Sequence, residues 1–440
     1  MVELLKDWQR THYSTEVTPE MDGKRVIVMG WCREIRDLGG IKFIKLGDRN
    51  GSIQITINKK QVNPKLMEEL NNLGREYVVA IEGTVKKNDQ APERKEIIPI
   101  SLKILNKSES PLPLEVETKK TPADLPTRLD ARYMDLRKRN IGAIFKIADT
   151  IKIGFIEFFA KEGFVHCNTP VIVAAATEGG SNLFSVKYFE REVFLSQSPQ
   201  LYKQMLMSTG FDKVSIVTPV FRAEPHDTYR HLNETTQMDI EIAFIRNEED
   251  VLKYYDSVIK HIYEKVKKER EKELKEFGID LKIPNVPIKR LDYDEAVELL
   301  NKQGVKMRWG DDINAEGERK LCELFNPLIV KRWPTAVRAF YSMPDPDNPK
   351  ICRAYDLLLN GLEISSGAQR VHLHGDLVNI LKKKGLSPED FNFYLEPFKY
   401  GMPPHGGWSI GLERITMAML KLPNIREATL FPRTKSRVTP

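Results

Sequence analysis

The sequence predicts an α+β protein in which a small β-barrel precedes a larger domain of antiparallel strands with flanking helices. Short β-rich runs broken by turn residues fill about 25–105, and helical periodicity first takes over at about 142–162. From there to the C-terminus, strand-like and helical segments mix without the regular alternation of a doubly wound sheet. A chain of 440 residues is also too long for one ordinary core and suits two or three domains.

Four β-rich runs make up the predicted barrel. They are "KRVIVMGWCREIRD", "GGIKFIKLGDRNGSIQITI", "YVVAIEGTVKK" and "EIIPISLKIL". In the second run, "DRNG" separates two alternating stretches and predicts a hairpin, which gives about five strands. This number of strands in roughly 90 residues favours a barrel of the oligonucleotide-binding kind, with an SH3-like barrel as the alternative.

The next segment predicts a hinge and then the larger domain. Residues 106–130 carry four prolines and many charges, which is typical of an extended linker. We therefore expect a barrel domain at 1–105, a hinge at 106–130 and a main domain at 131–440. Within the main domain, about 246–350 reads as a small mixed insertion that begins with a long charged helix near 248–276.

Composition restricts the class of protein. The net charge of +6 comes from 68 basic and 62 acidic residues, so binding of a polyanion would need a local basic surface. The four cysteines lie far apart, which fits a reducing compartment and argues against a cysteine-rich zinc site. The charged start and the absence of a long apolar run predict a cytoplasmic protein without a membrane partner.

The stretch "FRAEPHDTYRHLNE" at 221–234 predicts a hairpin with unusual charge. Arg222 and Arg230 bracket its loop, and the arginine fork grips phosphate oxygens two at a time. A solvent-exposed, salt-bridged hairpin is the alternative. The chain has neither a Walker loop nor a Rossmann glycine motif, so a nucleotide would have to be held by such side chains.

Two distant stretches complete a candidate triphosphate site. In "LEISSG", Glu363 and Ser366 offer oxygen ligands of the kind that Mg²⁺ accepts, although a strand carboxylate is more often a structural partner. In "GLER", a glycine-rich turn leads into a helix that carries Arg414 near its start, where anions are favoured. A capped core helix is the alternative for this second stretch.

Taken together, the motifs resemble those of class II aminoacyl-tRNA synthetases. "GFVHCNTPVI" with Pro170 resembles the dimer-interface motif, "FRAE…RHLNE…DIE" the second motif and "GLER" the third. The further stretches "TEGGSNLF", "QSPQLYKQ", "EISSGAQR", "YGMPPHGG" and "FPRTKSRVTP" are similar to the aspartyl-tRNA synthetases of archaeal and eukaryotic type. The resemblance covers nearly the whole chain and implies an OB-fold barrel, an antiparallel catalytic sheet and a homodimer.

The resemblance implies an aspartate–tRNA ligase that activates L-aspartate with ATP and Mg²⁺ and charges tRNA-Asp, with tRNA-Asn as a further acceptor left open. The implied catalytic residues are Arg222 and Arg414. The implied ATP contacts are Arg222, Ala223, Glu224, Arg230, His231, Leu232, Glu363, Gly411, Leu412, Glu413 and Arg414. The implied aspartate contacts are Glu178, Gln200, Leu201, Tyr202, Lys203, Arg222, Asp356, Ser366 and Arg370, and the implied metal ligands are Glu363 and Ser366.

The specificity argument rests on two cations. Lys203 and Arg370, if buried and facing the substrate, would favour the aspartate carboxylate over the neutral amide of asparagine. An asparaginyl-tRNA synthetase or a related asparagine-forming ligase is the enzyme alternative. A catalytically silent RNA-binding paralogue is the alternative from another class.

In the barrel, the resemblance implies that Phe43 and Gln54 contact an anticodon base, whereas a core position is the alternative for Phe43. The resemblance also implies that the choice between tRNA-Asp and tRNA-Asn depends on positions near Arg33 and Pro92, since that choice is associated with these barrel positions in related enzymes. The chain also departs from the family pattern at several positions, with Gly47 in place of an arginine, Thr235 of an aromatic residue, Ser409 of a glycine and Thr434 of an aspartate. These departures concern the anticodon backbone and the adenine environment.

Overall fold

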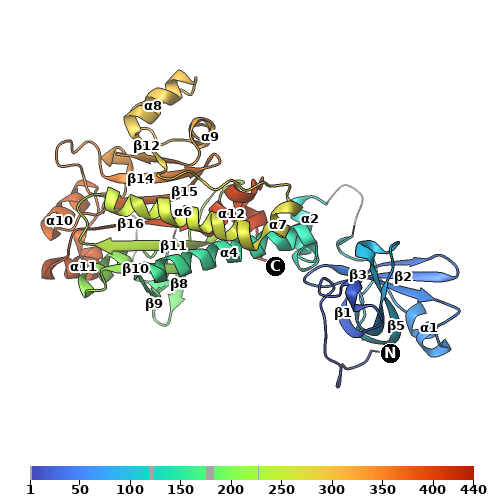
Figure 1. The fold of residues 1–440 in the computed structure, drawn as a ribbon. Helices are drawn as coiled ribbons and strands as arrows, with labels where there is room; N and C mark the ends of the chain where they lie inside the picture. The colour runs from blue at the N-terminus through green and yellow to red at the C-terminus, as the bar shows by residue number, and fades with distance from the viewer. Residues whose placement is uncertain (1, 118–122, 175–182, 226) are drawn as a thin grey trace. The chain divides into compact units, whose positions relative to one another are not determined.

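The computed structural model describes residues 2–117, 123–174, 183–225 and 227–440. The chain forms two compact units, Met1–Arg139 and Asn140–Pro440 (Figure 1). Each unit has its own buried apolar cluster, and each is described by itself below.

The first unit contains the predicted five-stranded barrel. Its strands are β1 (Arg25–Asp37), β2 (Ile41–Gly47), β3 (Ser52–Asn58), β4 (Val78–Lys87) and β5 (Lys95–Asn106), and α1 (Pro64–Asn71) connects β3 to β4. The barrel closes in the order β1-β2-β3-β5-β4. Alternate residues such as Ile44, Leu46, Ile53 and Ile55 fill its interior, as the period of two in a strand requires. The "DRNG" turn joins β2 to β3 as predicted, with Gly47 opposite Ser52.

The predicted hinge is not extended to its end. Residues Leu125–Asp130 form the helix α2, followed by α3 (Arg132–Asp135). The side chain of Asp124 accepts a hydrogen bond from the Thr127 amide and so caps α2, while a proline lies in the first turn, where its missing N–H costs nothing.

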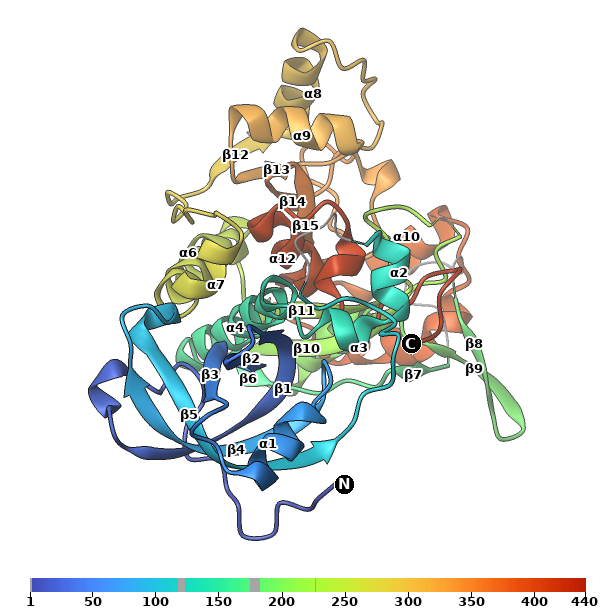
Figure 2. The ribbon, with the colours of Figure 1, turned by 90° about the vertical axis from the view of Figure 1, so that its right-hand side faces the viewer.

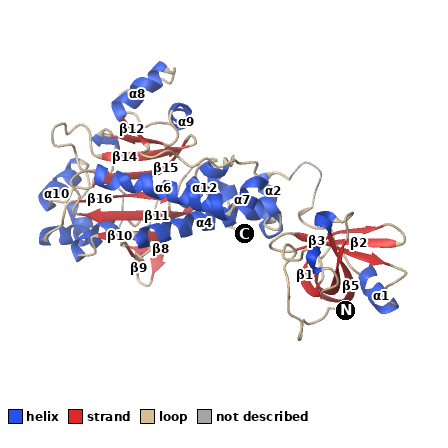
Figure 3. Ribbon diagram, in the orientation of Figure 1, coloured by secondary structure: helices blue, strands red, loops and turns tan. Residues whose placement is uncertain are grey.

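An eight-stranded sheet forms the centre of the second unit. Its order is β12-β13-β14-β15-β16-β11-β10-β6, and the red arrows of Figure 3 show it in one layer. The strands are β6 (Val165–His166), β10 (Lys213–Phe221), β11 (Glu234–Ala243), β12 (Lys289–Asp292), β13 (Leu328–Lys331), β14 (Ala354–Leu359), β15 (Leu362–Gln369) and β16 (His405–Gly411). All neighbours pair antiparallel except the two end pairs, which are parallel. The predicted α+β class is confirmed.

Two long helices cover one face of this sheet (Figures 1 and 2). They are α4 (Arg139–Lys161) and α6 (Glu249–Glu269), and Gly154 lets them approach closely because a Cβ there would lie 3.3 Å from the Lys265 side chain. Their aromatic residues meet Trp408 of β16, which stacks on Tyr255 at 4.5 Å. The predicted charged helix is interrupted at Arg270, after which α7 (Glu271–Glu276) begins.

Shorter elements complete the second unit. A three-stranded sheet contains β7 (Ile172–Val173), β9 (Arg191–Leu195) and β8 (Ser185–Tyr188), and α5 (Gln200–Leu206) follows it. The segment predicted as a mixed insertion contributes α8 (Tyr293–Lys302) and α9 (Ala315–Leu324), and α10 (His374–Lys383), α11 (Asn392–Leu395) and α12 (Leu412–Leu420) follow later. No helix in the described ranges has the length and apolar character needed to span a bilayer.

Candidate active site

The hairpin predicted at 221–234 is present. Strands β10 and β11 pair in register, with Phe221 opposite Glu234, and the loop between them holds the predicted cations. Asn233 closes the loop, because its backbone carbonyl accepts the Arg222 amide at 2.9 Å and its side chain donates to the Arg222 carbonyl at 2.7 Å. The sequence signal of two β-runs around a polar loop therefore located this element correctly.

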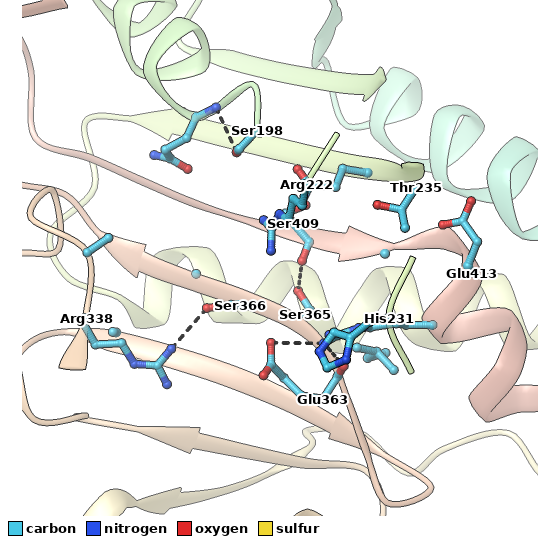
Figure 4. Close-up of a pocket in the computed structure, with 18 of the residues that line it drawn as sticks. Ser198, Arg222, His231, Thr235, Arg338, Glu363, Ser365, Ser366, Ser409 and Glu413 are labelled. Carbon is cyan, nitrogen blue, oxygen red and sulfur yellow. Dashed lines mark hydrogen bonds and ion pairs between the residues drawn. The ribbon is translucent and has the colours of Figure 1, made fainter. Parts of the chain in front are cut away.

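This hairpin loop contributes to a pocket of about 390 Å³ over the central strands (Figure 4). Segments far apart in the sequence supply its wall. The predicted residues that line it are Gln200, Arg222, Glu224, Arg230, His231, Leu232, Glu363, Ser366, Arg370, Gly411, Glu413 and Arg414. The three separate motifs thus meet in one cavity rather than on separate surfaces.

Arg222 is placed to meet an anion in this pocket. Its Nε donates to the Gln197 carbonyl at 3.4 Å, and none of the described carboxylates lies within 4.0 Å of its guanidinium. A cation that lacks a nearby carboxylate in a concave site favours binding of negative charge. This geometry suits a phosphate oxygen.

Arg414 and Glu363 lie side by side on α12 and β15. The Arg414 Nη1 donates to the Glu363 carbonyl at 2.9 Å and lies 3.7 Å from the Glu363 carboxylate. The backbone contact fixes the arginine at the start of α12, where the helix dipole also favours an anion. The guanidinium keeps further donors for a ligand.

Glu363 and Ser366 fit the requirements of a magnesium ion. The Glu363 side chain is 35% exposed, and both residues line the pocket. The described residues include no cluster of three histidine, cysteine or acidic side chains that would hold a metal alone. Mg²⁺ typically takes one or two carboxylates and completes its shell with water and phosphate oxygens, so these two ligands fit a metal that arrives with a nucleotide.

A buried charge cluster lies beneath the pocket. The Lys203 ammonium lies 2.8 Å from Asp239 Oδ1 and 3.4 Å from Glu241 Oε2, and the Arg370 Nε lies 3.0 Å from Glu241 Oε1. All four side chains are nearly inaccessible to solvent. Gly407 makes room for this cluster, because a Cβ there would lie 2.2 Å from Glu241 Oε2.

The two cations of the specificity argument therefore have different positions. Arg370 lines the pocket, but Lys203 lies behind it and does not face a ligand directly. Lys203 connects to the pocket through Asp239, whose second oxygen accepts a hydrogen bond from the Ser409 hydroxyl at 2.9 Å. Ser409, noted as a departure from the family pattern, thus bridges the cluster and the cavity.

The charges of the cluster are not held equally. Burial raises the pKa of Asp239, although Lys203 opposes this. Burial alone would also raise the pKa of Glu241, but Arg370 and Lys203 outweigh it and lower that pKa. Glu241 therefore keeps its negative charge beside Arg370, whereas burial disfavours the charged form of Asp239.

Sequence reasoning missed Arg338, which comes from the segment predicted as an insertion. Its guanidinium lies 3.8 Å from the centre of the Trp333 ring, and its Nη1 lies 3.2 Å from Asp356 Oδ1 and 3.5 Å from the Ser366 hydroxyl. Figure 4 shows Arg338 reaching towards Ser366. No motif in "PTAVRAF" marks this arginine, because only the fold brings it to the pocket.

Several predicted contacts do not line the cavity. Asp356 is 2% exposed and faces Arg338, and burial raises its pKa to about 7. Leu201 packs in a neighbouring apolar cluster and Tyr202 lies against Phe393. Ala223 and Leu412 also lie outside the lining, and Glu178 lies outside the described residues.

Glu413 is a buried carboxyl at the edge of the pocket. Its two oxygens lie 3.1 and 3.0 Å from the Thr236 amide nitrogen, and burial raises its pKa to about 7. Because this pKa lies above the usual value for a glutamate, the folded protein holds a proton that the unfolded chain releases as pH rises.

We expect this carboxyl to make stability fall as pH rises from about 4.5 to about 7, by up to about 3 kcal/mol. Asp356 adds a change of the same sign. In Glu413→Gln, the amide oxygen still accepts from Thr236 but cannot titrate. Thermal unfolding measured from pH 4.5 to 8 should show a shallower decline for this variant, and parallel curves for the two proteins would contradict the assignment.

In the barrel, Phe43 and Gln54 lie on the face of β2 and β3 that points away from the apolar interior. Both are half-buried, whereas their neighbours Ile44 and Ile53 are buried in the core. Phe43 lies opposite Thr56 in the β2–β3 pair. The Gln54 side chain donates a hydrogen bond to the Thr56 hydroxyl at 3.2 Å. Phe43 is therefore not part of the barrel core.

The two positions associated with tRNA choice differ in exposure. Arg33 is 5% exposed and pairs with Glu76 at 2.7 Å, whereas Pro92 lies on the surface. Gly47 is needed for this burial, because a Cβ there would lie 2.6 Å from Arg33 Nε. The glycine that departs from the family pattern thus accommodates the Arg33 side chain.

Known families match both units. The model of the tRNA synthetases class II (D, K and N) matches residues 124–435, and that of the OB-fold nucleic acid binding domain matches residues 26–105. The aspartate–tRNA(Asp/Asn) ligase of Methanocaldococcus jannaschii is 48% identical over 441 residues, with 100% of both chains covered. The aspartate–tRNA(Asp) ligase of Pyrococcus abyssi is also 48% identical, with 98% of this chain and 100% of the relative covered.

Solved structures are similar over the same length. The asparaginyl-tRNA synthetase of Pyrococcus horikoshii complexed with asparaginyl-adenylate has a TM-score of 0.93 at 34% identity, covering 98% of this chain and 100% of that one. A putative aspartyl-tRNA synthetase of Leishmania major has a TM-score of 0.89 at 29% identity, covering 100% and 97%.

Since one family model covers most of the chain and relatives match it from end to end, the chain belongs to the class II tRNA synthetases and is an aminoacyl-tRNA synthetase. Within that family, its full-length relatives include aspartate–tRNA ligases of archaeal type. The resemblance drawn from the sequence motifs, the OB-fold barrel and the antiparallel catalytic sheet are all confirmed.

Proposed function

We propose that the protein is an aspartate–tRNA ligase that forms aspartyl-adenylate from L-aspartate and ATP and transfers the aspartyl group to tRNA. The main supporting observation is that Arg370, which is held from behind by Glu241, lines the same pocket as the phosphate-binding candidates Arg222 and Arg414. One cavity can therefore hold a carboxylate side chain at one end and a triphosphate at the other.

Positioning and fixed charge carry the proposed activation step. The α-carboxylate of aspartate attacks the α-phosphorus of ATP, and the bond to the bridging oxygen of pyrophosphate breaks. Negative charge grows on the α-phosphate oxygens, where Arg222 stabilises it without having to reorganise. Arg230, His231 and Arg414 hold the outgoing phosphates, and the Thr236-bound Glu413 supports the turn beneath them.

Glu363 and Ser366 would hold the magnesium ion, which supplies neutralisation of phosphate charge when bound. Arg338 lies next to this pair and already places one positive charge beside Asp356. Arg338 therefore supplies a positive charge among the oxygen atoms of Asp356, Glu363 and Ser366 in this part of the wall.

A second candidate function is activation of asparagine, which the high similarity to an asparaginyl-tRNA synthetase favours. The charge of the pocket argues against it, since the neutral amide would leave Arg370 without a further counter-charge. Pyrophosphate exchange with each amino acid decides between them. We expect exchange with aspartate to exceed that with asparagine by about 10²-fold or more, because the buried cation Arg370 would lose its anionic partner. Preferred exchange with asparagine would refute the proposal.

The barrel is the proposed anticodon site, with Phe43 as a stacking platform. We expect Phe43→Ala to weaken tRNA binding by about 1–3 kcal/mol, the contribution of one stacked base. Filter binding of tRNA-Asp measures this, and aspartate-dependent pyrophosphate exchange, which needs no anticodon, should be unchanged. Val62→Ala, also in the barrel but packed against its core, serves as the control for a loss of stability alone.

Two further parts of the proposed function are the acceptance of tRNA-Asn and the formation of a homodimer. The names of the relatives divide between tRNA(Asp/Asn) and tRNA(Asp), so similarity alone supports both outcomes. The exposed Pro92 resembles the type of enzyme that accepts both tRNAs, and it favours acceptance of tRNA-Asn. Charging of purified tRNA-Asp and tRNA-Asn with labelled aspartate tests this.

We also propose a homodimer that forms through the segment around Pro170. Sedimentation measures the oligomeric state.

A further inference from the structure

Glu318 is a buried carboxylate behind the wall of the pocket. It lies on α9 and is 3% exposed, and it does not belong to the residues that line the cavity. Each of its two oxygens accepts one hydrogen bond. Oε1 accepts from Arg230 Nη2 at 2.5 Å, and Oε2 accepts from the backbone amide of Glu363 at 2.9 Å.

Both donors belong to the part of the site proposed to hold the triphosphate. Arg230 comes from the β10–β11 loop and lines the pocket with its 14% exposed side chain. Glu363 comes from β15 and is the proposed carboxylate ligand of magnesium. One carboxylate therefore connects three separate segments, namely the hairpin loop, α9 and β15.

The helix that carries Glu318 is itself firmly placed. At Gly317 a Cβ would lie 2.8 Å from the Ile313 side chain and 3.2 Å from Leu300 of α8, so α9 packs closely there. At the β14–β15 turn, Gly361 has φ of +80° and its Cβ position lies 3.3 Å from the Arg319 backbone. A rigid support of this kind sets the position of a side chain more accurately than a loop can.

Burying the Glu318 carboxylate costs free energy, and its partners have to compensate for that cost. Burial raises the pKa of Glu318, and Arg230 opposes that rise. A well-packed apolar pair often stabilises a fold as well as a buried ion pair does, so stability alone is a weak reason for such a pair. The partners themselves, a phosphate-binding cation and a ligand strand, supply a functional reason.

We propose that Glu318 is a positioning residue that holds the Arg230 guanidinium and the Glu363 backbone in the orientation needed by the triphosphate. It does not touch the substrate, and it acts through Arg230. The inference rests on the proposed ATP-dependent activation of aspartate. Without Glu318, Arg230 keeps its charge but gains rotamer freedom, and that freedom has to be lost again when ATP binds.

The test uses Glu318→Gln in the full-length protein. The amide oxygen can still accept from Glu363, while the charged partner of Arg230 is lost. We expect KM for ATP in aspartate-dependent pyrophosphate exchange to rise, or kcat to fall, by about tenfold in total, because small displacements of positioning groups are costly. Transfer of the aspartyl group from preformed adenylate to tRNA does not use the β- and γ-phosphates and should be unchanged.

A double-mutant cycle with Arg230→Ala separates positioning from a general effect on folding. If Glu318 acts through Arg230, Glu318→Gln should have little further effect on exchange in the Arg230→Ala background. The exposed Glu316→Gln on the same helix is the matched control and should behave as the unmodified protein. Thermal unfolding of every variant shows whether the fold is retained.

The outcomes are distinct. Unchanged exchange by Glu318→Gln, tighter ATP binding, an equal loss in both backgrounds or an equal loss in the transfer step would overturn the positioning role. Absence of aspartate-dependent exchange in the unmodified protein would instead refute the proposed function.

Discussion

Arg222→Ala should lower the rate of aspartyl-adenylate formation by about 10³-fold, in line with the loss of one preorganised donor to a developing oxyanion. The guanidinium lines the pocket and has none of the described carboxylates within 4.0 Å, so its charge is available to the α-phosphate. Pyrophosphate exchange with saturating aspartate and ATP measures the loss.

Two controls restrict the interpretation of that result. Arg222→Lys keeps a charge but lacks the planar fork, and we expect it to recover only a small part of the rate. Arg246→Ala removes an exposed arginine whose pair with Asp250 contributes little, and it should leave exchange unchanged. Binding of tRNA should persist in Arg222→Ala, and exchange at the normal rate would exclude the assigned role.

Arg370→Met should strongly reduce aspartate activation and also destabilise the protein. The pocket loses the cation that we propose as the partner of the substrate carboxylate, and we expect kcat/KM for aspartate to fall by about 10²-fold or more. At the same time Glu241 loses its closer partner while fully buried, at a cost of about 3–5 kcal/mol. Exchange kinetics and denaturant unfolding measure the two effects separately.

The double variant Arg370→Met, Glu241→Gln distinguishes specificity from stability. Neutralising Glu241 removes the unpaired buried charge, so part of the lost stability should return while Lys203 keeps its 2.8 Å contact with Asp239. Activation of aspartate should stay low, because nothing replaces the cation at the pocket. Recovery of activity together with stability would mean that Arg370 serves the fold and not the substrate.

The sequence predicted the local elements of the site because each has a short-range signal. Alternating β-runs around a polar loop located the β10–β11 hairpin, and glycine before a helical pattern located the turn into α12 with Arg414. The barrel followed from the spacing of its strands. Signals of this type depend on neighbours in the chain, which are the same in the sequence and in the fold.

The errors came where two signals competed or where burial decided the outcome. The hinge contained a helix because the Asp124 cap and a first-turn proline outweighed the extended character of the segment. Lys203 was expected to face the substrate, but in the structure a carboxylate stands between it and the pocket. Whether a charged side chain reaches a cavity depends on which partners surround it.

By itself, the sequence predicted the barrel and the antiparallel sheet, the hairpin that carries Arg222 and Arg230, and the family to which the chain is similar. Only the tertiary structure decided that Arg338 lies beside Ser366, that Lys203 lies behind Asp239 and that Glu318 joins Arg230 to β15. The physical reason is that these contacts join residues far apart in the chain. The charged side chains meet their partners only when the sheet and the helix α9 bring them together. No pattern along the sequence predicts which of them will pair.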